Sequence, residues 1–174
     1  MSKLVLYIAA SLDGYIARSD HGLDWLLKFD NSQTDYGYSE FYSSVDAVLM
    51  GRKTYEVALS LGPWAYRDKP NFVMSRSTDK FEHALKVSGE IGPVVTELKS
   101  RFSCIWLVGG AELLSQSLSA RCLDEIIITV IPVILGSGIR LFESPIEETE
   151  LIQTEVRSYS RGLAQIKYSI IYNP

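Results

Sequence analysis

The strongest chemical signal in this chain comes from glycines that stand between a strand pattern and a helical pattern. Cys104 to Val108 is a short apolar run rich in residues that favour strands, Gly109 and Gly110 end it, and leucines recur at helical spacing from Ala111 onward. Glycines at such a junction let the backbone approach a ligand, and the free N–H groups at the helix start favour an anion such as phosphate. A glycine pair is also common in a plain turn, so this motif alone leaves both interpretations open.

A second junction of the same design carries positive charge. Val45 to Met50 is another short apolar run, Gly51 ends it, and a helix-compatible stretch then opens with two cations and a hydroxyl residue, Arg52, Lys53 and Thr54. The helix dipole disfavours cations at a helix N-terminus, so two of them call for an anionic partner unless both extend into water. Two glycine-bearing junctions in one small chain, one of them basic, indicate a ligand with several phosphates.

Two hydroxyls surround one cation after a further apolar run. Asn71 to Met74 reads as a buried strand, and it ends in Ser75, Arg76 and Ser77. The arginine fork and the two hydroxyl donors suit a phosphate monoester. A solvated turn is the alternative.

The first apolar run also ends in polar residues. Lys3 to Ala10 leads into Ser11 and Asp13, which either cap a turn before Gly14 or contact a substrate. Beyond them, Arg18 to Thr34 is long and irregular, which is typical of a lid or a binding loop.

The elements that must position these motifs alternate between strand and helix and then become strands alone. We predict strands at Lys3–Ala10, Val45–Met50, Asn71–Met74, Leu85–Val87, Cys104–Val108 and Asp124–Ile134, and a closing hairpin of Ile152–Val156 and Leu163–Tyr172. We predict helices at Asp35–Ser44, after Gly51, at Pro93–Phe102 and from Ala111. This order predicts an α/β domain with a mostly parallel sheet and an antiparallel C-terminal edge. Ligands of such sheets bind at the carboxyl ends of the strands, where all the motifs fall.

Composition narrows the class of protein. The 174 residues, 47% of them hydrophobic, predict a single domain over 1–174 with a substantial core. A net charge of −4 argues against nucleic acid as a partner. Two histidines and two cysteines, without ligand spacing, predict no metal site. Because no signal-peptide pattern or membrane-length apolar run is present, we expect a cytoplasmic protein that does not bind membranes.

In order and spacing, the motifs resemble those of the dihydrofolate-reductase-like superfamily, and more closely its branch with the reductase domain of bacterial riboflavin biosynthesis, the RibD C-terminal type. The resemblance implies a three-layer α/β/α fold, a homodimer, and NADPH as hydride donor to a small heterocyclic or sugar-amine substrate. The activity that the resemblance implies is that of a 5-amino-6-(5-phosphoribosylamino)uracil reductase. A dihydrofolate reductase and a catalytically silent NADPH-binding protein are the alternatives. The resemblance is carried by Ser11–Ala17, Met50–Glu56, Val73–Ser77, Trp106–Gly110 and Pro132–Gly138 with Leu141 and Phe142.

The resemblance also implies roles for individual residues. The segment from Gly51 to Thr54 would hold the pyrophosphate and the adenosine side, the segment from Ser75 to Ser77 would select the 2′-phosphate, and a cis peptide would join the glycine pair. The implied cofactor-binding residues are Ala9, Ile16, Gly51, Arg52, Lys53, Thr54, Ser75, Arg76, Ser77, Val108, Gly109, Gly110, Ala111, Glu112 and Leu113. The predicted substrate-binding residues are Ser11, Asp13 and Trp25.

Two departures from the relatives bear on the substrate. Riboflavin reductases carry Asp-Asp-Pro and a following Arg for the ribosyl phosphate, where this chain has Met50 to Thr54. Folate reductases hold the pterin with an acidic residue on the first helix, where this chain offers no clear match. A proton must accompany hydride transfer, and a carboxyl group or an ordered water delivers it. The candidate proton donors are Asp13, Asp24, Asp35 and Glu40.

Overall fold

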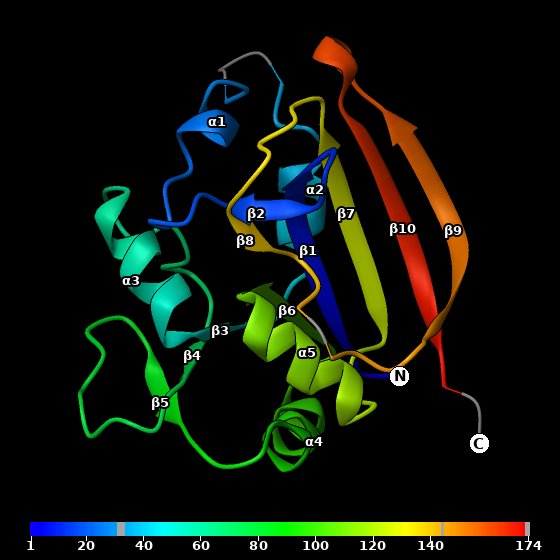
Figure 1. Ribbon diagram of the computed structural model, residues 1–174. Coiled ribbons are helices and arrows are strands. Elements are labelled where there is room, and N and C mark those ends of the chain that lie inside the picture. The colour runs from blue at the N-terminus through cyan, green and yellow to red at the C-terminus, as the bar shows by residue number, and fades with distance from the viewer. Residues whose placement is uncertain (31–33, 144, 173–174) are drawn as a thin grey trace.

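Residues 1–30, 34–143 and 145–172 are described by the computed structural model. They form an eight-stranded sheet with helices on both faces and a separate two-stranded sheet (Figure 1). The strands are β1 (Lys3–Ser11), β2 (Tyr15–Ala17), β3 (Ala47–Gly51), β4 (Asn71–Met74), β5 (Leu85–Val87), β6 (Cys104–Gly109), β7 (Glu125–Ile131), β8 (Ile139–Arg140), β9 (Glu150–Ser158) and β10 (Ala164–Ile171). The helices are α1 (Asp24–Leu27), α2 (Tyr38–Ser43), α3 (Arg52–Ser60), α4 (Ile91–Arg101), α5 (Ala111–Ser119) and the 3-10 helix η1 (Ser160–Gly162).

The large sheet has the strand order β5-β4-β3-β6-β1-β7-β10-β9. The strands from β5 to β7 in this order run parallel, and β10 and β9 are antiparallel neighbours at one edge. This confirms the mostly parallel sheet with an antiparallel C-terminal edge. Parallel strands direct their carboxyl ends to the same edge of the sheet, so the residues that follow those strands lie near one another.

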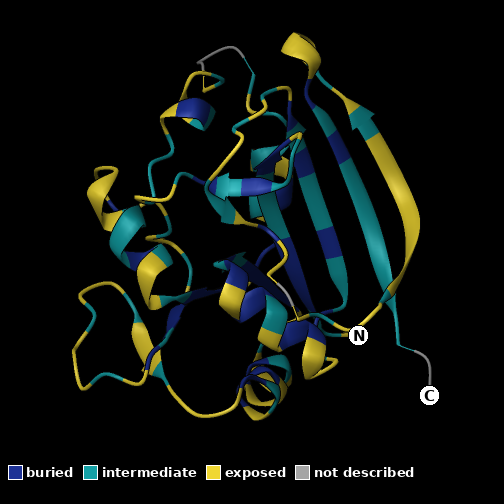
Figure 2. Ribbon diagram, in the orientation of Figure 1, coloured by how far each residue is buried: buried dark blue, intermediate teal, exposed yellow. Residues whose placement is uncertain are grey.

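Both faces of the central strands are buried, which explains why these strands read as continuous apolar runs. Leu4 and Leu6 of β1 pack with α4 and α5 on one face. Val5 and Tyr7, which alternate with them, pack with α2 and α3 on the other face. The central strands are accordingly buried while the outer sides of the helices are exposed (Figure 2). The helix–sheet–helix layering is the three-layer α/β/α arrangement that the resemblance implied.

The C-terminal hairpin is confirmed, and its outer strand is the exposed edge of the sheet. β10 pairs with β7 on one side and with β9 on the other. Along β9, Leu151, Ile152 and Val156 are 40%, 55% and 52% exposed. The predicted homodimer stays a prediction.

Two predicted elements end or begin elsewhere for local reasons. The helix predicted from Asp35 begins at Tyr38, because the Asp35 carboxylate accepts the N–H groups of Gly37 and Ser39 and caps the turn before the helix. The strand predicted to reach Ile134 ends at Ile131, whose carbonyl accepts the Val133 N–H at 2.7 Å and turns the chain.

Other differences concern short elements. α4 begins at Ile91, two residues before Pro93, because proline is tolerated in the first turn of a helix. Part of the predicted irregular loop forms α1, and positions 31–33 of that loop lie outside the described residues. β2 and β8, which pair with each other, were not predicted because two or three residues are too few to show a pattern.

No helix in the described part of the chain is long and apolar enough to span a bilayer. No group of three or more His, Cys, Asp and Glu side chains in that part could hold a metal ion. Cys104 and Cys122 are free thiols, and burial raises the pKa of both.

Candidate active site

The sheet opens between two neighbouring parallel strands. β1 and β6 pair from Lys3 and Cys104 up to Leu6 and Leu107. Beyond this point β1 continues along β7, and β6 stays with β3. A cleft of about 1640 Å³ lies where the strands part, and Ile8, Ala9 and Val108 line it there. A crevice at the carboxyl ends of diverging strands is the usual ligand site of an open α/β sheet.

The two glycine junctions meet at the floor of this cleft. Met50 and Gly109 are paired in neighbouring strands. A Cβ atom built on Gly51 would lie 3.7 Å from the Gly109 carbonyl oxygen and 3.7 Å from the Gly110 nitrogen. A Cβ atom on Gly110 would lie 3.6 Å from Oγ1 of Thr54. The Gly109–Gly110 peptide bond is cis, as the resemblance implied. The starts of α3 and α5 therefore border the same cavity.

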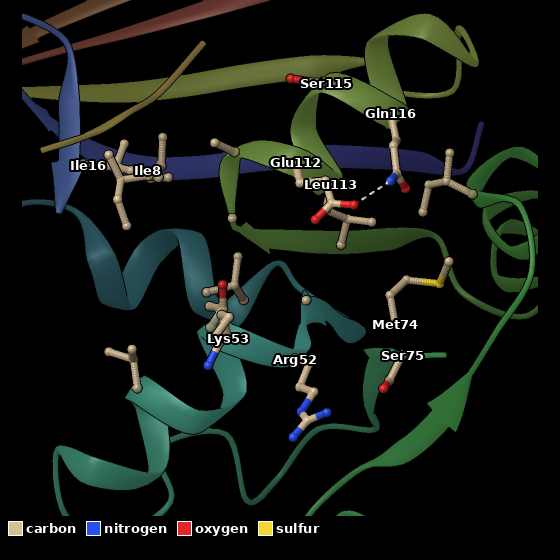
Figure 3. A pocket seen from close by; sticks show the side chains of 18 of the residues that line it. Ile8, Ile16, Arg52, Lys53, Met74, Ser75, Glu112, Leu113, Ser115 and Gln116 are labelled. Atoms are coloured by element: carbon tan, nitrogen blue, oxygen red, sulfur yellow. Dashed lines mark hydrogen bonds between the residues drawn. The ribbon is translucent and has the colours of Figure 1, made fainter. Parts of the chain in front are cut away.

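Figure 3 shows how the lining side chains are distributed. Ile8 and Ile16 lie at one end of the view, and Met74 and Ser75 lie at the other. Arg52 and Lys53, from α3, lie across from Glu112 and Leu113 of α5 (Figure 3). Gln116 donates a hydrogen bond of 3.1 Å to Glu112. The cleft is thus flanked by the first turns of two helices.

The cations at the start of α3 have an internal anionic partner. The Arg52 guanidinium donates to Glu56 at 2.8 Å, and the Lys53 ammonium donates to the other oxygen at 3.0 Å. These hydrogen bonds, the one from Lys53 first, lower the pKa of Glu56. Arg52 also lies 3.6 Å from Asp79. Exposed ion pairs of this kind contribute little free energy, so a bound phosphate can replace the carboxylates at small cost.

The segment after β4 forms a compact hydroxyl turn around a cation. Oγ of Ser75 lies 3.0 Å from Oγ of Ser77 and accepts the Ser77 N–H at 3.1 Å. The ammonium of Lys86 donates to the Ser77 carbonyl at 2.7 Å. Arg76, between the two serines, is exposed and lines the cleft. This turn therefore brings two hydroxyls and a guanidinium to one end of the cavity.

The predicted cofactor residues are brought together by the fold, although their binding of a cofactor stays a prediction. Gly109 lies beside Gly51 without lining the cleft, and every other residue of the set lines it: Ala9, Ile16, Gly51, Arg52, Lys53, Thr54, Ser75, Arg76, Ser77, Val108, Gly110, Ala111, Glu112 and Leu113. The predicted binding loop also contributes, through His21, Leu23 and Leu26.

Asp13, by contrast, anchors a neighbouring loop and is not among the lining residues. Its carboxylate accepts the Ser11 hydroxyl at 2.7 Å and the N–H groups of Leu135 and Gly136 at 3.0 and 2.7 Å. These hydrogen bonds, led by that from Ser11, lower the pKa of Asp13 to about 2. A group with this pKa is ionised at neutral pH and has no proton to donate.

The other three candidate proton donors are engaged outside the cleft. Asp24 accepts both nitrogens of the Arg18 fork, and Glu40 accepts both terminal nitrogens of Arg157. These arginine hydrogen bonds lower the pKa of Asp24 and of Glu40. Asp35 caps the turn before α2, and hydrogen bonds from the side chain and the N–H of Ser39 lower its pKa. Catalytic roles for these residues stay predictions, and their contacts support structural ones.

Two predicted substrate-binding residues, Ser11 and Trp25, are buried away from the cavity lining. The Ser11 hydroxyl donates to Asp13 and accepts the Tyr15 N–H at 2.9 Å. Trp25 is 1% exposed and packs with Ile131 and Leu163 in a small hydrophobic cluster. The irregular sequence around Trp25 suggested a binding loop, but its indole serves to fix α1 to the sheet.

An aromatic end of the cleft was not predicted. Tyr7, Tyr66 and Trp106 line it. The Tyr7 ring stacks on Phe41 with a centroid distance of 4.1 Å, and Trp106 lies edge-on to Tyr7 at 6.0 Å. In the sequence these residues read as ordinary core. One feature of the sequence could have indicated this end of the cleft. Tyr7 carries a hydroxyl inside an otherwise apolar strand, and a buried hydroxyl needs a hydrogen-bond partner.

The sheet order and the layering define a class of protein, the dihydrofolate-reductase-like α/β domains. Within this class, the model of the RibD C-terminal domain family matches residues 2–165, and the chain belongs to that family. The protein YwjB of Bacillus subtilis (strain 168) is 46% identical over 170 residues, which are 95% of this chain and 97% of YwjB.

Solved structures agree with this assignment. A structure titled "Putative riboflavin biosynthesis protein", from Shewanella sp. PV-4, superposes with a TM-score of 0.89 and 29% identity over 99% of this chain and all of that one. Dihydrofolate reductase from Enterococcus faecalis, complexed with NADP(H), superposes with a TM-score of 0.68 and 16% identity over 97% of this chain and 96% of that chain. At that identity the second likeness shows the fold alone.

Proposed function

We propose that this protein is an NADPH-dependent reductase that transfers hydride to a small heterocyclic or sugar-amine substrate, as 5-amino-6-(5-phosphoribosylamino)uracil reductase does. Membership of the RibD C-terminal domain family supports a reductase in general. The observation that carries the proposal is the meeting of the two glycine junctions, with a Cβ on Gly51 only 3.7 Å from backbone atoms of Gly109 and Gly110. Side-chain-free backbone at two helix starts is what a pyrophosphate requires.

The cleft fits a dinucleotide phosphate. Its volume of about 1640 Å³ exceeds the ~300–1,000 Å³ typical of sites for drug-sized ligands. The starts of α3 and α5 would hold the pyrophosphate, and Ser75, Arg76 and Ser77 would hold the 2′-phosphate. When bound, the nicotinamide would supply the hydride. Ala9 and Ile16, at the parting of the strands, would orient the ring and exclude water from it.

The test is a titration of the purified protein with NADPH and, separately, with NADH. We expect micromolar binding of NADPH and clearly weaker binding of NADH, because only NADPH carries the phosphate that Arg76 and the two serines would contact. No binding of either cofactor at millimolar concentration would contradict the proposal. Equal affinities would contradict the role given to the segment from Ser75 to Ser77.

A catalytically silent NADPH-binding protein is the second candidate. It is favoured by two features of the four carboxylates predicted to donate the proton: hydrogen bonds lower the pKa of each, and none of them lines the cleft. Turnover assays with reduced cofactor separate the two candidates, since a reductase oxidises NADPH when a substrate is added. Tight NADPH binding without turnover of 5-amino-6-(5-phosphoribosylamino)uracil or dihydrofolate would favour the silent protein.

A further inference from the structure

A buried amide holds the hydroxyl of Tyr7 in one orientation. Gln165 of β10 is 8% exposed, and its Nε2 atom lies 3.0 Å from Oγ1 of Thr129, 3.3 Å from the Tyr7 hydroxyl and 3.4 Å from the Tyr36 carbonyl oxygen. A backbone carbonyl can only accept a hydrogen bond, so the amide nitrogen must be the atom that faces these three oxygens. The two N–H groups of the amide are shared among these three oxygens, and the Tyr7 hydroxyl oxygen is one of their acceptors. Oε1 accepts from Tyr159 at 3.4 Å.

This orientation leaves the Tyr7 hydrogen free to donate to a group other than Gln165. Because the Tyr7 oxygen accepts from Gln165, its own O–H must be directed elsewhere, and Tyr7 lines the cleft beside Ile8 and Ala9. Burial raises the pKa of Tyr7 to about 12, so the hydroxyl is protonated at neutral pH. Tyr7, a lining residue close to the parting of the strands, thus carries a neutral hydrogen-bond donor.

The surroundings of this donor are aromatic. Tyr7 stacks on Phe41 within 11° of parallel, and the Trp106 indole donates a hydrogen bond of 3.0 Å to the Tyr7 carbonyl. Tyr66, also in the lining, stands edge-on to Trp106 at 5.2 Å. Flat rings fixed in this way select a planar ligand ring by stacking and edge contacts.

Carboxylates are placed on the other side of the cleft. Those that line it, within the described residues, are Glu90, Glu112 and Glu143. Glu90 and Glu112 stand at the starts of α4 and α5, which pack on the opposite face of the sheet from Tyr7. Glu143 follows Leu141, which packs on that same opposite face. The Asp35 charge contributes to the raised pKa of Tyr7, but Asp35 is not among the lining residues. A protonated amidine-like ring edge, which needs a carboxylate partner, therefore meets none in the described lining beside Tyr7.

We propose that Tyr7 is a substrate-binding residue whose hydroxyl donates a hydrogen bond to a carbonyl oxygen or ring nitrogen of a planar, uncharged heterocycle, and that Gln165 is its positioning residue. The proposal rests on the proposed function in placing the heterocycle in the substrate half of this cleft. It distinguishes the chain from a folate reductase, because the site offers a neutral donor in place of an acidic acceptor.

The experiment compares two probes with the same bicyclic ring. Lumazine carries carbonyl acceptors at positions 2 and 4, and 2,4-diaminopteridine carries amino groups there and is more readily protonated. Each probe is titrated by calorimetry into the protein, with and without NADPH. We expect lumazine to bind at least about tenfold more tightly. Tyr7→Phe should weaken lumazine binding about threefold to tenfold, the loss expected for one hydrogen bond, and leave NADPH binding unchanged.

Two further variants separate this role from general damage. Tyr172→Phe is the matched control, because it removes a hydroxyl that donates to the Leu123 carbonyl and does not line the cleft. It should change neither titration. Gln165→Met removes the orienting amide and should weaken lumazine less than Tyr7→Phe does. Combining it with Tyr7→Phe should add no further loss, because both act through one hydroxyl.

Several outcomes would overturn the proposal: tighter binding of 2,4-diaminopteridine, unchanged lumazine affinity in Tyr7→Phe, or no binding of either probe. These outcomes leave the cofactor titration as an independent result. Conversely, lumazine binding that depends on Tyr7 in a protein that fails to bind NADPH would support the subsite and contradict the reductase.

Discussion

The two sets of residues predicted from this sequence have different positions in the structure. The glycines, hydroxyls and cations predicted to hold a cofactor come from three separate strand ends, those of β3, β4 and β6, and meet in one cleft. The carboxylates predicted to donate a proton lie outside that lining, and each is bound to another partner. The position after a strand brought the glycines, hydroxyls and cations together, but it was not sufficient for Asp13, which follows β1 and yet does not line the cleft.

The physical reason is the range of the interactions involved. Parallel strands place their carboxyl ends at one edge, so strand order and direction are enough to collect the residues that follow them. A carboxylate has no such constraint. Asp13 accepts from Leu135 and Gly136, and Glu40 pairs with Arg157, more than a hundred positions away in each case. No local pattern in the sequence records these partners.

Gly110→Val is the strongest test of the part of the cleft that is predicted to bind the cofactor. The first added carbon would make ordinary contact with Thr54 at 3.6 Å, but the two methyl groups would occupy the space between the starts of α3 and α5. We expect no binding of NADPH or NADH at millimolar concentration. Relative to a micromolar dissociation constant, this is a loss of affinity of more than about a thousandfold. Gly110→Ala should show a smaller loss.

Circular dichroism and thermal unfolding provide the control for Gly110→Val, since the comparison requires a folded variant. A folded Gly110→Val protein with normal affinity would mean that the glycine pair is only a turn. The meeting of the two junctions would then be a feature of packing, and the predicted cofactor site would lose its main support.

Arg76→Ala tests the selectivity of the same part of the cleft. Losing one charged hydrogen bond should weaken NADPH binding by about 1–3 kcal/mol and leave NADH binding unchanged, because NADH lacks the 2′-phosphate. Lys80→Ala is a suitable control, since it removes the same charge from an exposed position four residues away that does not line the cleft. Equal losses for both cofactors would exclude the 2′-phosphate assignment.

The sequence predicted most of the fold and most of the residues that meet around the two glycine junctions, whose binding of a cofactor stays a prediction. The bounds of β4 were predicted as the structure has them, and the helix after Gly110 begins where expected, because apolar runs and glycine breaks are local signals. The aromatic end was missed, since Tyr7 and Trp106 cannot be told from core residues without knowing that β1 and β6 part after Leu6. That divergence is decided by competition between neighbouring strands, which no single segment encodes.

Asp13→Asn tests whether this carboxylate is structural. An amide in its place would accept the Leu135 N–H and present a donor to the N–H of Gly136, so we expect lower stability at neutral pH with unchanged NADPH binding. Hydrogen bonding lowers the pKa of Asp13 in the folded protein to about 2. The stabilisation is therefore present above the unfolded pKa of about 4 and is lost as the pH falls toward 2.

Urea unfolding of both proteins at several pH values measures this difference. The gap between the wild-type and Asp13→Asn midpoints should be widest at neutral pH and should narrow below about pH 4. Equal midpoints at all pH values, combined with loss of turnover, would instead return Asp13 to the list of proton donors. That result would show that at least one of the carboxylates predicted to donate the proton acts in catalysis although it lies outside the cleft lining.

Glu40→Gln should have the smallest effect. Both partners of the Glu40–Arg157 pair are on the surface, with side chains 68% and 35% exposed, and exposed pairs are screened by solvent. Arg157 also keeps its hydrogen bond to Glu155, so it is not left unpaired. We expect little change in the unfolding midpoint and none in NADPH affinity or turnover. A large loss of turnover at normal stability would contradict this expectation. It would indicate that the Glu40 carboxylate leaves Arg157 and contacts the substrate when the substrate is bound.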